Sequence, residues 1–218
     1  MPRPLRIEYP EALYHVTTRG SQQGAIFRDD HDRASFLAIL ARTLKACDAC
    51  AFAYCLMGNH YHVVLQTHQA NLSMLVRRVN SLHSLTFNRR HGCRGHVFDG
   101  RYKALHVDRD AYLLEVCRYV DLNPVRAGLV ESPAQWTWSS YRAHTGSVPP
   151  PAWLSTTQLH ASLTGSLGHG VTQAELACRS YADWVRAGRG VQLWRTGLLH
   201  GQYLGGEAFA ARVEGLRR

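Results

Sequence analysis

No stretch of this sequence supplies the roughly 18 consecutive apolar residues that a membrane-spanning helix needs. Residues 1–6 also lack the apolar core of a secretory signal peptide. We therefore expect a cytoplasmic protein with no membrane partner. Its six cysteines are then expected to be reduced.

The cysteines give little support to a zinc or redox site. Cys47 and Cys50 form a C-x-x-C pair, but no second such pair follows at the spacing of a zinc ribbon. The other four cysteines are scattered along the chain. This pattern favours packed free thiols.

Acidic residues are also few. The chain has 16 Asp and Glu against 25 Lys and Arg, which leaves a formal net charge of +9 over 218 residues. Such an excess favours a polyanionic partner, and nucleic acid is the first expectation, with a place at the nucleoid. The alternative is a basic protein without such a partner.

Hydrophobic periodicity predicts an α+β protein. The expected order is strand, helix, strand, strand, helix, strand, helix, which describes a ferredoxin-like, mostly antiparallel sheet with helices on one face. Asn71 and Asp110 are the expected caps of the second and third helices. The predicted strands cover residues 12–18, 51–57, 60–66, 97–98 and 101–107, and the predicted helices cover 31–46, 71–90 and 111–122.

A proline-rich segment at residues 148–151 predicts a boundary between a first domain, residues 1–147, and a small helical extension, residues 148–218. Helices are expected at 157–163 and 172–187, and with weaker support across 198–216. The aromatic residues of this extension indicate that it folds; they include Trp184, Trp194 and Tyr203.

The chemistry of the first domain starts at His60 and His62. Strand side chains alternate between faces, so both imidazoles are expected on one face, about 7 Å apart along the strand. Tyr61 would then point into a core on the opposite face. Two such imidazoles can share a metal ion. A His-x-His pair by itself is a weak signal, however, because isolated strand histidines are commonly structural.

A second pair of polar residues lies on the last predicted helix of this domain. Tyr119 and Asn123 are four residues apart, so a helix presents them on one face, away from the apolar stripe that packs on the sheet. The purely structural alternative is a tyrosine that packs its ring and an asparagine that caps the helix before Pro124.

Taken together, these motifs resemble a known family. The run Asn59-His60-Tyr61-His62-Val63-Val64-Leu65 resembles the His-hydrophobe-His motif of HUH endonucleases. Residues 118–130 are similar to the catalytic helix of single-tyrosine transposases, and above all of REP-associated tyrosine transposases, relatives of the insertion-sequence 200/605 family. The resemblance covers about residues 5–145, with further matching motifs at 14–20, 95–103 and 138–141.

The resemblance implies an HUH fold and a DNA nickase and strand transferase. His60, His62 and Asn123 would bind Mg²⁺ or Mn²⁺, and Tyr119 would attack a scissile phosphate to give a covalent 5′-phosphotyrosine and a free 3′-hydroxyl. The sequence does not identify the base that helps Tyr119; Glu115 is one candidate.

The expected substrate is single-stranded hairpin DNA, bound by a monomer or a homodimer. Basic residues along the first domain would contact phosphates, although a cluster at a helix end is also what a solvated helix terminus shows. The candidates are Arg19, Arg77, Arg78, Arg89, Arg90, Arg94, Arg101, Lys103 and Arg126.

Three other functions remain open. A DNA-binding regulator would need neither the histidines nor Tyr119. A metal phosphoesterase would use the histidines and leave Tyr119 structural. An RNA-binding ferredoxin-like module is supported by fold type alone, which is weak evidence.

Overall fold

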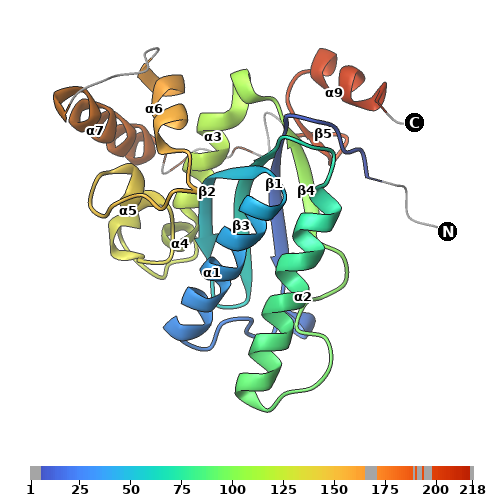
Figure 1. Ribbon diagram of the computed structural model, residues 1–218. Coiled ribbons are helices and arrows are strands. Elements are labelled where there is room, and N and C mark those ends of the chain that lie inside the picture. Colours follow the sequence, from blue (N-terminus) through green and yellow to red (C-terminus); the bar gives the residue numbers. More distant parts are fainter. Residues whose placement is uncertain (1–5, 165–170, 189, 191–192, 194–197, 217–218) are drawn as a thin grey trace.

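A sheet with strand order β2-β3-β1-β4-β6-β5 forms the centre of the protein (Figure 1). The structure is a computed structural model that describes residues 6–164, 171–188, 190, 193 and 198–216. β1 pairs antiparallel with β3 and β4, and β2 with β3, while the short β6 joins β4 in parallel. The strands are β1 (Ala12–Arg19), β2 (Ala49–Leu56), β3 (His60–Thr67), β4 (Lys103–Val107), β5 (Leu198–Leu199) and β6 (Tyr203–Leu204).

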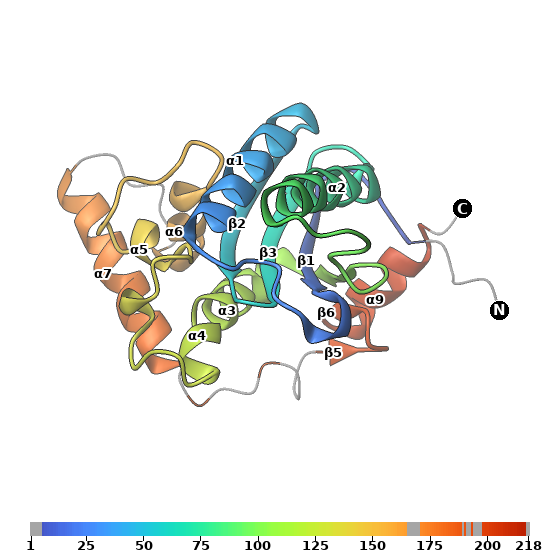
Figure 2. The ribbon, with the colours of Figure 1, turned by 90° about the horizontal axis from the view of Figure 1, so that it is seen from below.

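The helices of the first domain cover both faces of this sheet (Figure 2). α1 and α2 pack on one face over a shared apolar cluster, and α3 packs on the other face over a second apolar cluster. The predicted order of elements is confirmed, but the expectation that all helices share one face was wrong. These helices are α1 (Asp30–Ala46), α2 (Leu72–His91) and α3 (Arg109–Asp121).

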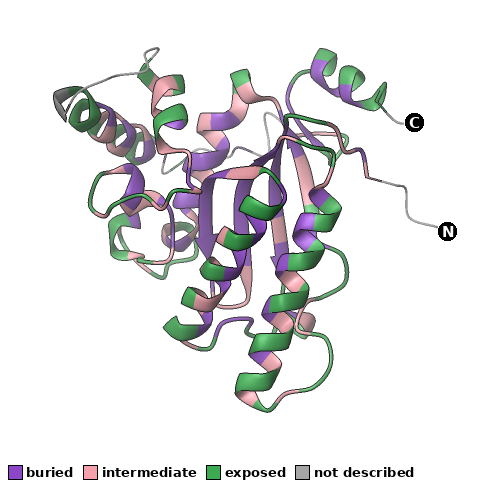
Figure 3. Ribbon diagram, in the orientation of Figure 1, coloured by how far each residue is buried: buried purple, intermediate pink, exposed green. Residues whose placement is uncertain are grey.

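Because helices cover both faces of the sheet, the strands have apolar residues at successive positions. Tyr61, Val63 and Leu65 of β3 are buried under α1 and α2, whereas Val64 is buried under α3. Figure 3 shows the sheet buried and the outer surfaces of α1 and α2 exposed. Because side chains alternate along a strand, the same register turns His60 and His62 toward α3.

Local boundaries differ slightly from those predicted. Asn71 is the N-cap of α2 as expected, but α3 begins at Arg109 with Asp108, not Asp110, as its N-cap. Phe98, expected in a short strand, instead makes an isolated bridge with Gly20.

The extension after residue 148 adds to the same structure. It contains α6 (Thr156–Thr164), α7 (Val171–Ala187) and α9 (Glu207–Glu214), so the two better-supported helices are confirmed. The prediction of a helix across 198–216 was partly wrong, because β5 and β6 precede α9. Tyr181 and Leu159 enter the apolar cluster beneath α3, and Trp184 packs against it, while Trp194 lies outside the described residues.

Across the described ranges, no helix is both long and apolar enough to span a membrane.

His144, in the short helix α5 (Tyr141–His144), lies between strand β2 of the sheet and helix α7 of the extension. Its ring is buried, and Nε2 lies 2.8 Å from the carbonyl oxygen of Phe52 in β2. Tyr181 of α7 packs against it with ring centroids 4.7 Å apart. Burial lowers the pKa of His144 to about 3 from its ordinary 6.5. The folded protein therefore keeps this ring neutral at pH values where the unfolded chain protonates it.

We predict that stability falls as the pH drops below 6.5, and that His144→Gln reduces this loss because its amide can still donate to Phe52 but does not titrate. From pH 7 to pH 5, the free energy of unfolding of the variant should fall by about 2 kcal/mol less than that of the wild type. Urea denaturation at both pH values measures this difference, and parallel pH dependence in the two proteins would contradict it.

Candidate active site

His60 and His62 project from β3 onto the face covered by α3, as predicted. Their ring centroids are 5.1 Å apart and the ring planes are nearly perpendicular, at 82°. Tyr61, between them, points to the opposite face, where its hydroxyl donates to Asn80 Oδ1 at 2.7 Å. The two imidazoles are thus adjacent on one face and are separated from the main core.

The orientation of His60 is set by its neighbour Asn59. His60 Nδ1 lies 2.7 Å from Asn59 Oδ1. Because Asn59 Nδ2 donates to the carbonyl of Gln23 at 3.2 Å, its oxygen faces the ring, and an amide oxygen can only accept. His60 therefore carries its proton on Nδ1, which leaves the lone pair of Nε2 for a ligand.

His62 has an analogous partner in His15, a residue that the sequence analysis did not select. His15 Nε2 lies 3.0 Å from His62 Nδ1, and both rings are buried. In the β1–β3 register His15 is opposite Val64, so it reaches His62 diagonally across the strand pair. Alternation along β1 puts His15 on the face opposite Tyr14, but only the β1–β3 register shows that this is the face of His62.

Tyr119 approaches these histidines edge-on from α3. Its ring centroid is 6.0 Å from that of His15 and 6.1 Å from that of His62, in T-shaped geometry. The guanidinium carbon of Arg126 lies 4.7 Å from the Tyr119 ring centroid, in cation–π range. The structure therefore brings the predicted nucleophile beside His62, one of the two predicted metal ligands, and under a positive charge.

Asn123 begins the short helix α4 (Asn123–Arg126) directly after the tyrosine helix. Its Nδ2 donates to the carbonyls of Tyr119 and Val120, at 3.0 and 3.3 Å. A metal ion would use Oδ1, the amide atom outside those two bonds. This engagement fixes Asn123 against the last turn of α3, close in the chain to Tyr119.

The donors present fit a divalent ion of the Mg²⁺ or Mn²⁺ type. In the described part of the chain, no group of three or more His, Cys, Asp or Glu side chains is placed to hold a metal. The candidate set is instead two imidazoles and one amide oxygen, which water would complete. Nitrogen donors suit Mn²⁺ better than Mg²⁺, which prefers oxygen.

Burial keeps the site histidines neutral, as metal ligation requires. Burial lowers the pKa of His60, and the positive charge of Arg19 lowers it further. Burial lowers the pKa of His62 well below its usual range, and that of His15 to about 3.

Three of the predicted DNA contacts belong to the face of this site. Arg19 is exposed and pairs in register with His60, and Lys103 is exposed and pairs with Thr17, so both lie on the α3 side of the sheet. Arg126 is the third, over Tyr119. These charges surround the imidazoles from two strands and one helix.

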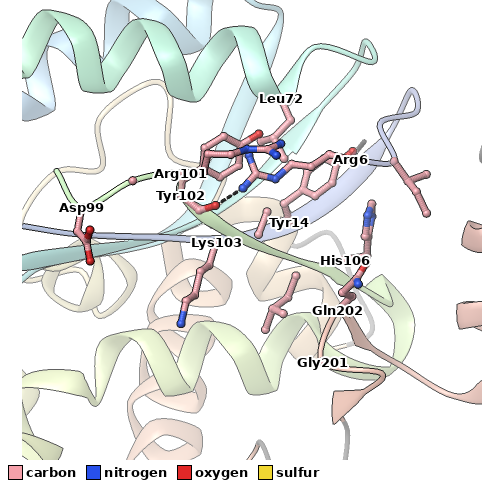
Figure 4. A pocket seen from close by; sticks show the side chains of 14 residues that line it. Arg6, Tyr14, Leu72, Asp99, Arg101, Tyr102, Lys103, His106, Gly201 and Gln202 are labelled. Atoms are coloured by element: carbon pink, nitrogen blue, oxygen red, sulfur yellow. Dashed lines mark hydrogen bonds between the residues drawn. The ribbon is translucent and has the colours of Figure 1, made fainter. Parts of the chain in front are cut away.

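The other predicted contacts lie elsewhere. Arg77, Arg78 and Arg89 are exposed on α2, across the sheet from Tyr119, and Arg94 and Arg101 are exposed in the loop before β4. A pocket of about 520 Å³ lies beside β4. In Figure 4, Lys103 points toward α3, away from Arg6, whose guanidinium lies over the ring of Tyr102.

Arg90 has a structural role that the sequence did not reveal. It forms ion pairs with Asp29 and Asp32 at the start of α1, both at 2.6 Å, and His91 bonds the same Asp32 at 2.9 Å. These pairs hold the end of α2 to the beginning of α1. A DNA contact by Arg90 stays a prediction, and it would have to compete with these bonds.

Comparison with known proteins identifies the family of this chain. Residues 8–123 match the model of the family described as "Transposase IS200 like". This chain belongs to the IS200-like transposases. They are enzymes that act on DNA, and the matched segment contains Tyr119, Asn123, His60 and His62. No curated protein matches the chain.

Two solved structures were found to be similar, and the first supports the fold of this transposase. One of them, described as a REP-associated tyrosine transposase bound to a REP hairpin, is 13% identical with a TM-score of 0.57, over 71% of this chain and 92% of that one. A protein of Deinococcus radiodurans assigned as a transposase is 14% identical with a TM-score of 0.39, over 55% of this chain and 96% of that one.

The C-terminal extension of the transposase packs against Arg118 of the tyrosine helix α3. This buried arginine lies over the ring of Trp184 in α7, with its guanidinium carbon 4.2 Å from the ring centroid. It also forms an ion pair with Glu115, the candidate base, one turn earlier in α3. Glu115 is therefore engaged beside Arg118, and its role as a base stays a prediction.

A second link between α7 and α3 is fully buried. Tyr181 donates its hydroxyl hydrogen bond to Asp121 Oδ2, and Ser140 donates to Oδ1, both at 2.7 Å. Burial raises the pKa of Asp121 to about 7, although both hydrogen bonds lower it. Asp121 lies two residues from Tyr119, so this network anchors the end of the helix that carries the predicted nucleophile.

We predict that Tyr181→Phe destabilises the transposase by about 1–3 kcal/mol, because it leaves one oxygen of a buried carboxyl group without its donor. Urea denaturation measures the loss. Tyr112→Phe, which removes a hydroxyl from a half-buried ring on α3, is the matched control. Equal stability of Tyr181→Phe and the wild type would show that the hydrogen bond contributes nothing.

Proposed function

We propose that this transposase cuts and rejoins single-stranded DNA through a covalent bond to Tyr119, at hairpins of repetitive sequence. The observation that carries the proposal is the meeting of Tyr119 with His62 and His15, at ring centroid distances near 6 Å. A regulator that only binds DNA needs no such meeting. The alternatives with a silent or a merely structural Tyr119 are therefore less well supported.

In the proposed step, the hydroxyl oxygen of Tyr119 attacks the scissile phosphorus. A bond forms between that oxygen and phosphorus, and the bond from phosphorus to the 3′-oxygen breaks. The phenol proton passes to water or to a base, and the departing 3′-oxygen takes a proton from water or from that base to become a hydroxyl. The phosphodiester energy is kept in the phosphotyrosine, so a 3′-hydroxyl can reverse the step and join strands without ATP.

His60, His62 and Asn123 would hold a Mg²⁺ or Mn²⁺ ion for this reaction. When bound, such an ion supplies a Lewis acid that neutralises charge on the phosphate oxygens. The residues themselves position the reaction: Asn59 orients the ring of His60, and the bond from Asn123 to the Tyr119 carbonyl holds the Asn123 amide at the end of the tyrosine helix. The guanidinium of Arg126, over the ring of Tyr119, would stabilise negative charge that develops during the attack.

The substrate class rests on charge and on a structural neighbour. Arg19 and Lys103 flank the imidazoles and can contact the phosphates on either side of the cut. The REP-associated transposase of similar fold is bound to a REP hairpin, which supports a hairpin substrate here. Contacts from the α2 arginines would need the stem to cross to the other side of the sheet.

We further propose that residues 1–147 carry the chemistry and that the extension braces α3. Tyr119 faces His62 of its own chain, which supports a site completed within one subunit, whether the protein is a monomer or a homodimer. The bonds from Tyr181 and the Trp184 contact to Arg118 support the bracing role.

The direct test is adduct formation. The protein is incubated with end-labelled single-stranded hairpin DNA from the repeats that flank its own gene, with Mn²⁺ or Mg²⁺, and resolved on a denaturing gel. We expect a metal-dependent protein–DNA adduct that Tyr119→Phe abolishes and Tyr112→Phe retains. Cleavage that persists in Tyr119→Phe would indicate a phosphoesterase, and binding without cleavage a DNA-binding regulator.

Arg126 allows a finer test of the nucleophile. Replacement by Met keeps most of the side-chain volume but removes the charge over Tyr119, so we expect adduct formation to slow about tenfold in single-turnover assays. Arg186→Met, an exposed arginine of α7, is the control. A change confined to DNA affinity, with an unchanged single-turnover rate, would show that Arg126 contacts phosphate and does not assist Tyr119.

A further inference from the structure

His15 is the buried polar residue of the site that the proposed reaction leaves without a role. It lies in β1 at 3% exposure, beside a metal-pair histidine and not among the apolar residues of either core. Its Nε2 is 3.0 Å from His62 Nδ1. Three strand histidines therefore converge, although the candidate ligands include only two of them.

The His15–His62 contact is a hydrogen bond in the plane of both rings. The ring planes are within 5° of parallel and the centroids are 5.2 Å apart. Rings stacked face to face keep their atoms about 3.5 Å or more apart, so a 3.0 Å nitrogen–nitrogen distance places the rings edge to edge. At this distance one nitrogen must donate and the other must accept, because two N–H groups or two lone pairs facing each other would repel.

We propose that His15 is a positioning residue that accepts the Nδ1 proton of His62 and so fixes the lone pair of His62 Nε2 toward the metal. In the opposite arrangement His62 Nε2 would carry the proton, and that nitrogen would be unable to ligate. The proposal rests on the metal site inferred above and extends it with an orienting partner.

His60 provides an internal parallel. Its Nδ1 bonds Asn59 Oδ1 at 2.7 Å, which forces the same tautomer on His60. With His15 in the assigned role, both metal-pair histidines donate from Nδ1 to a fixed acceptor and both present Nε2. Partners of this kind orient ligating imidazoles, and their loss commonly weakens metal binding about 10- to 100-fold.

The arrangement also explains why a histidine, and not an apolar residue, occupies this position of β1. The face of β1 toward α3 otherwise presents Leu13 to the core. A leucine in place of His15 would leave His62 Nδ1 buried without an acceptor. Either His62 would rotate or its proton would move to Nε2, and both changes remove a ligand.

The first test measures the tautomer in the protein without added metal. Long-range proton–nitrogen correlation spectra of the imidazoles distinguish the two neutral forms, and His62→Asn identifies the His62 signals by their loss. We expect wild-type His62 to carry its proton on Nδ1 and His15 to have a bare Nε2. A proton on Nε2 of His62 would overturn the proposal, and this measurement needs no His15 variant.

The second test compares His15→Gln with His15→Leu. The glutamine oxygen can accept where His15 Nε2 does, so His15→Gln should keep most of the Mn²⁺ affinity of the wild type, measured by electron paramagnetic resonance. His15→Leu should lose about 10- to 100-fold in affinity and shift the His62 proton to Nε2. His83→Leu, at a buried histidine of α2, controls for general destabilisation.

The outcomes separate this proposal from the metal site on which it rests. Wild-type protein that binds Mn²⁺ no better than His62→Asn would overturn the metal site, and the role of His15 with it. Tight Mn²⁺ binding that His15→Leu retains would overturn the role of His15 alone. Weaker binding with an unchanged His62 tautomer would also overturn it, because His15 would then be a ligand itself.

Discussion

The packing of α3 on the second face of the sheet is the constraint on which the site depends. Leu113, Val116 and Val120 form a buried stripe against the sheet, and a helix fixed by such a stripe has no freedom to rotate about its axis. Tyr119 precedes Val120, so it emerges at the edge of the contact, above the imidazoles of β3. The apolar residues thus position the hydroxyl of the predicted nucleophile, although none of them is a candidate for the chemistry itself.

The extension strengthens this constraint at the positions where α3 carries polar groups. Arg118 and Asp121 are buried on a helix that presents Tyr119 between them, and each has one of its partners in α7. Burying a carboxyl group is unfavourable unless it accepts hydrogen bonds, and Tyr181 and Ser140 supply the donors that Asp121 needs. A chain without α7 would have to solvate both groups, and the end of the tyrosine helix would lose its fixed place. The extension is therefore part of how the site is held, even though it contributes no candidate ligand.

Sequence patterns predicted the parts of the structure that depend on local periodicity. Alternation placed His60 and His62 together, helical spacing placed Tyr119 beside Asn123, and the order of the first seven elements followed from the same signals. The face on which α3 packs was not predictable this way, because its stripe fits either side of a sheet that is apolar on both. β5 and β6 were missed because strands of two residues have no period. His15 and Arg90 acquire their partners across strands and helices distant in sequence, so their roles appear only once the register is known.

The histidine cluster shows how such a site weakens the fold that contains it. His15, His60 and His62 are held neutral by burial, so each resists protonation in the folded state but not in the unfolded chain. Below neutral pH the unfolded chain therefore binds protons that the folded protein does not bind, and the free energy of unfolding falls. A core of valines would have no such dependence. Neutral imidazoles with fixed lone pairs are, however, what a metal ion requires, and a bound ion would stabilise the folded state in return. The acid sensitivity and the proposed metal affinity thus arise from the same burial, and neither can be removed without changing the other.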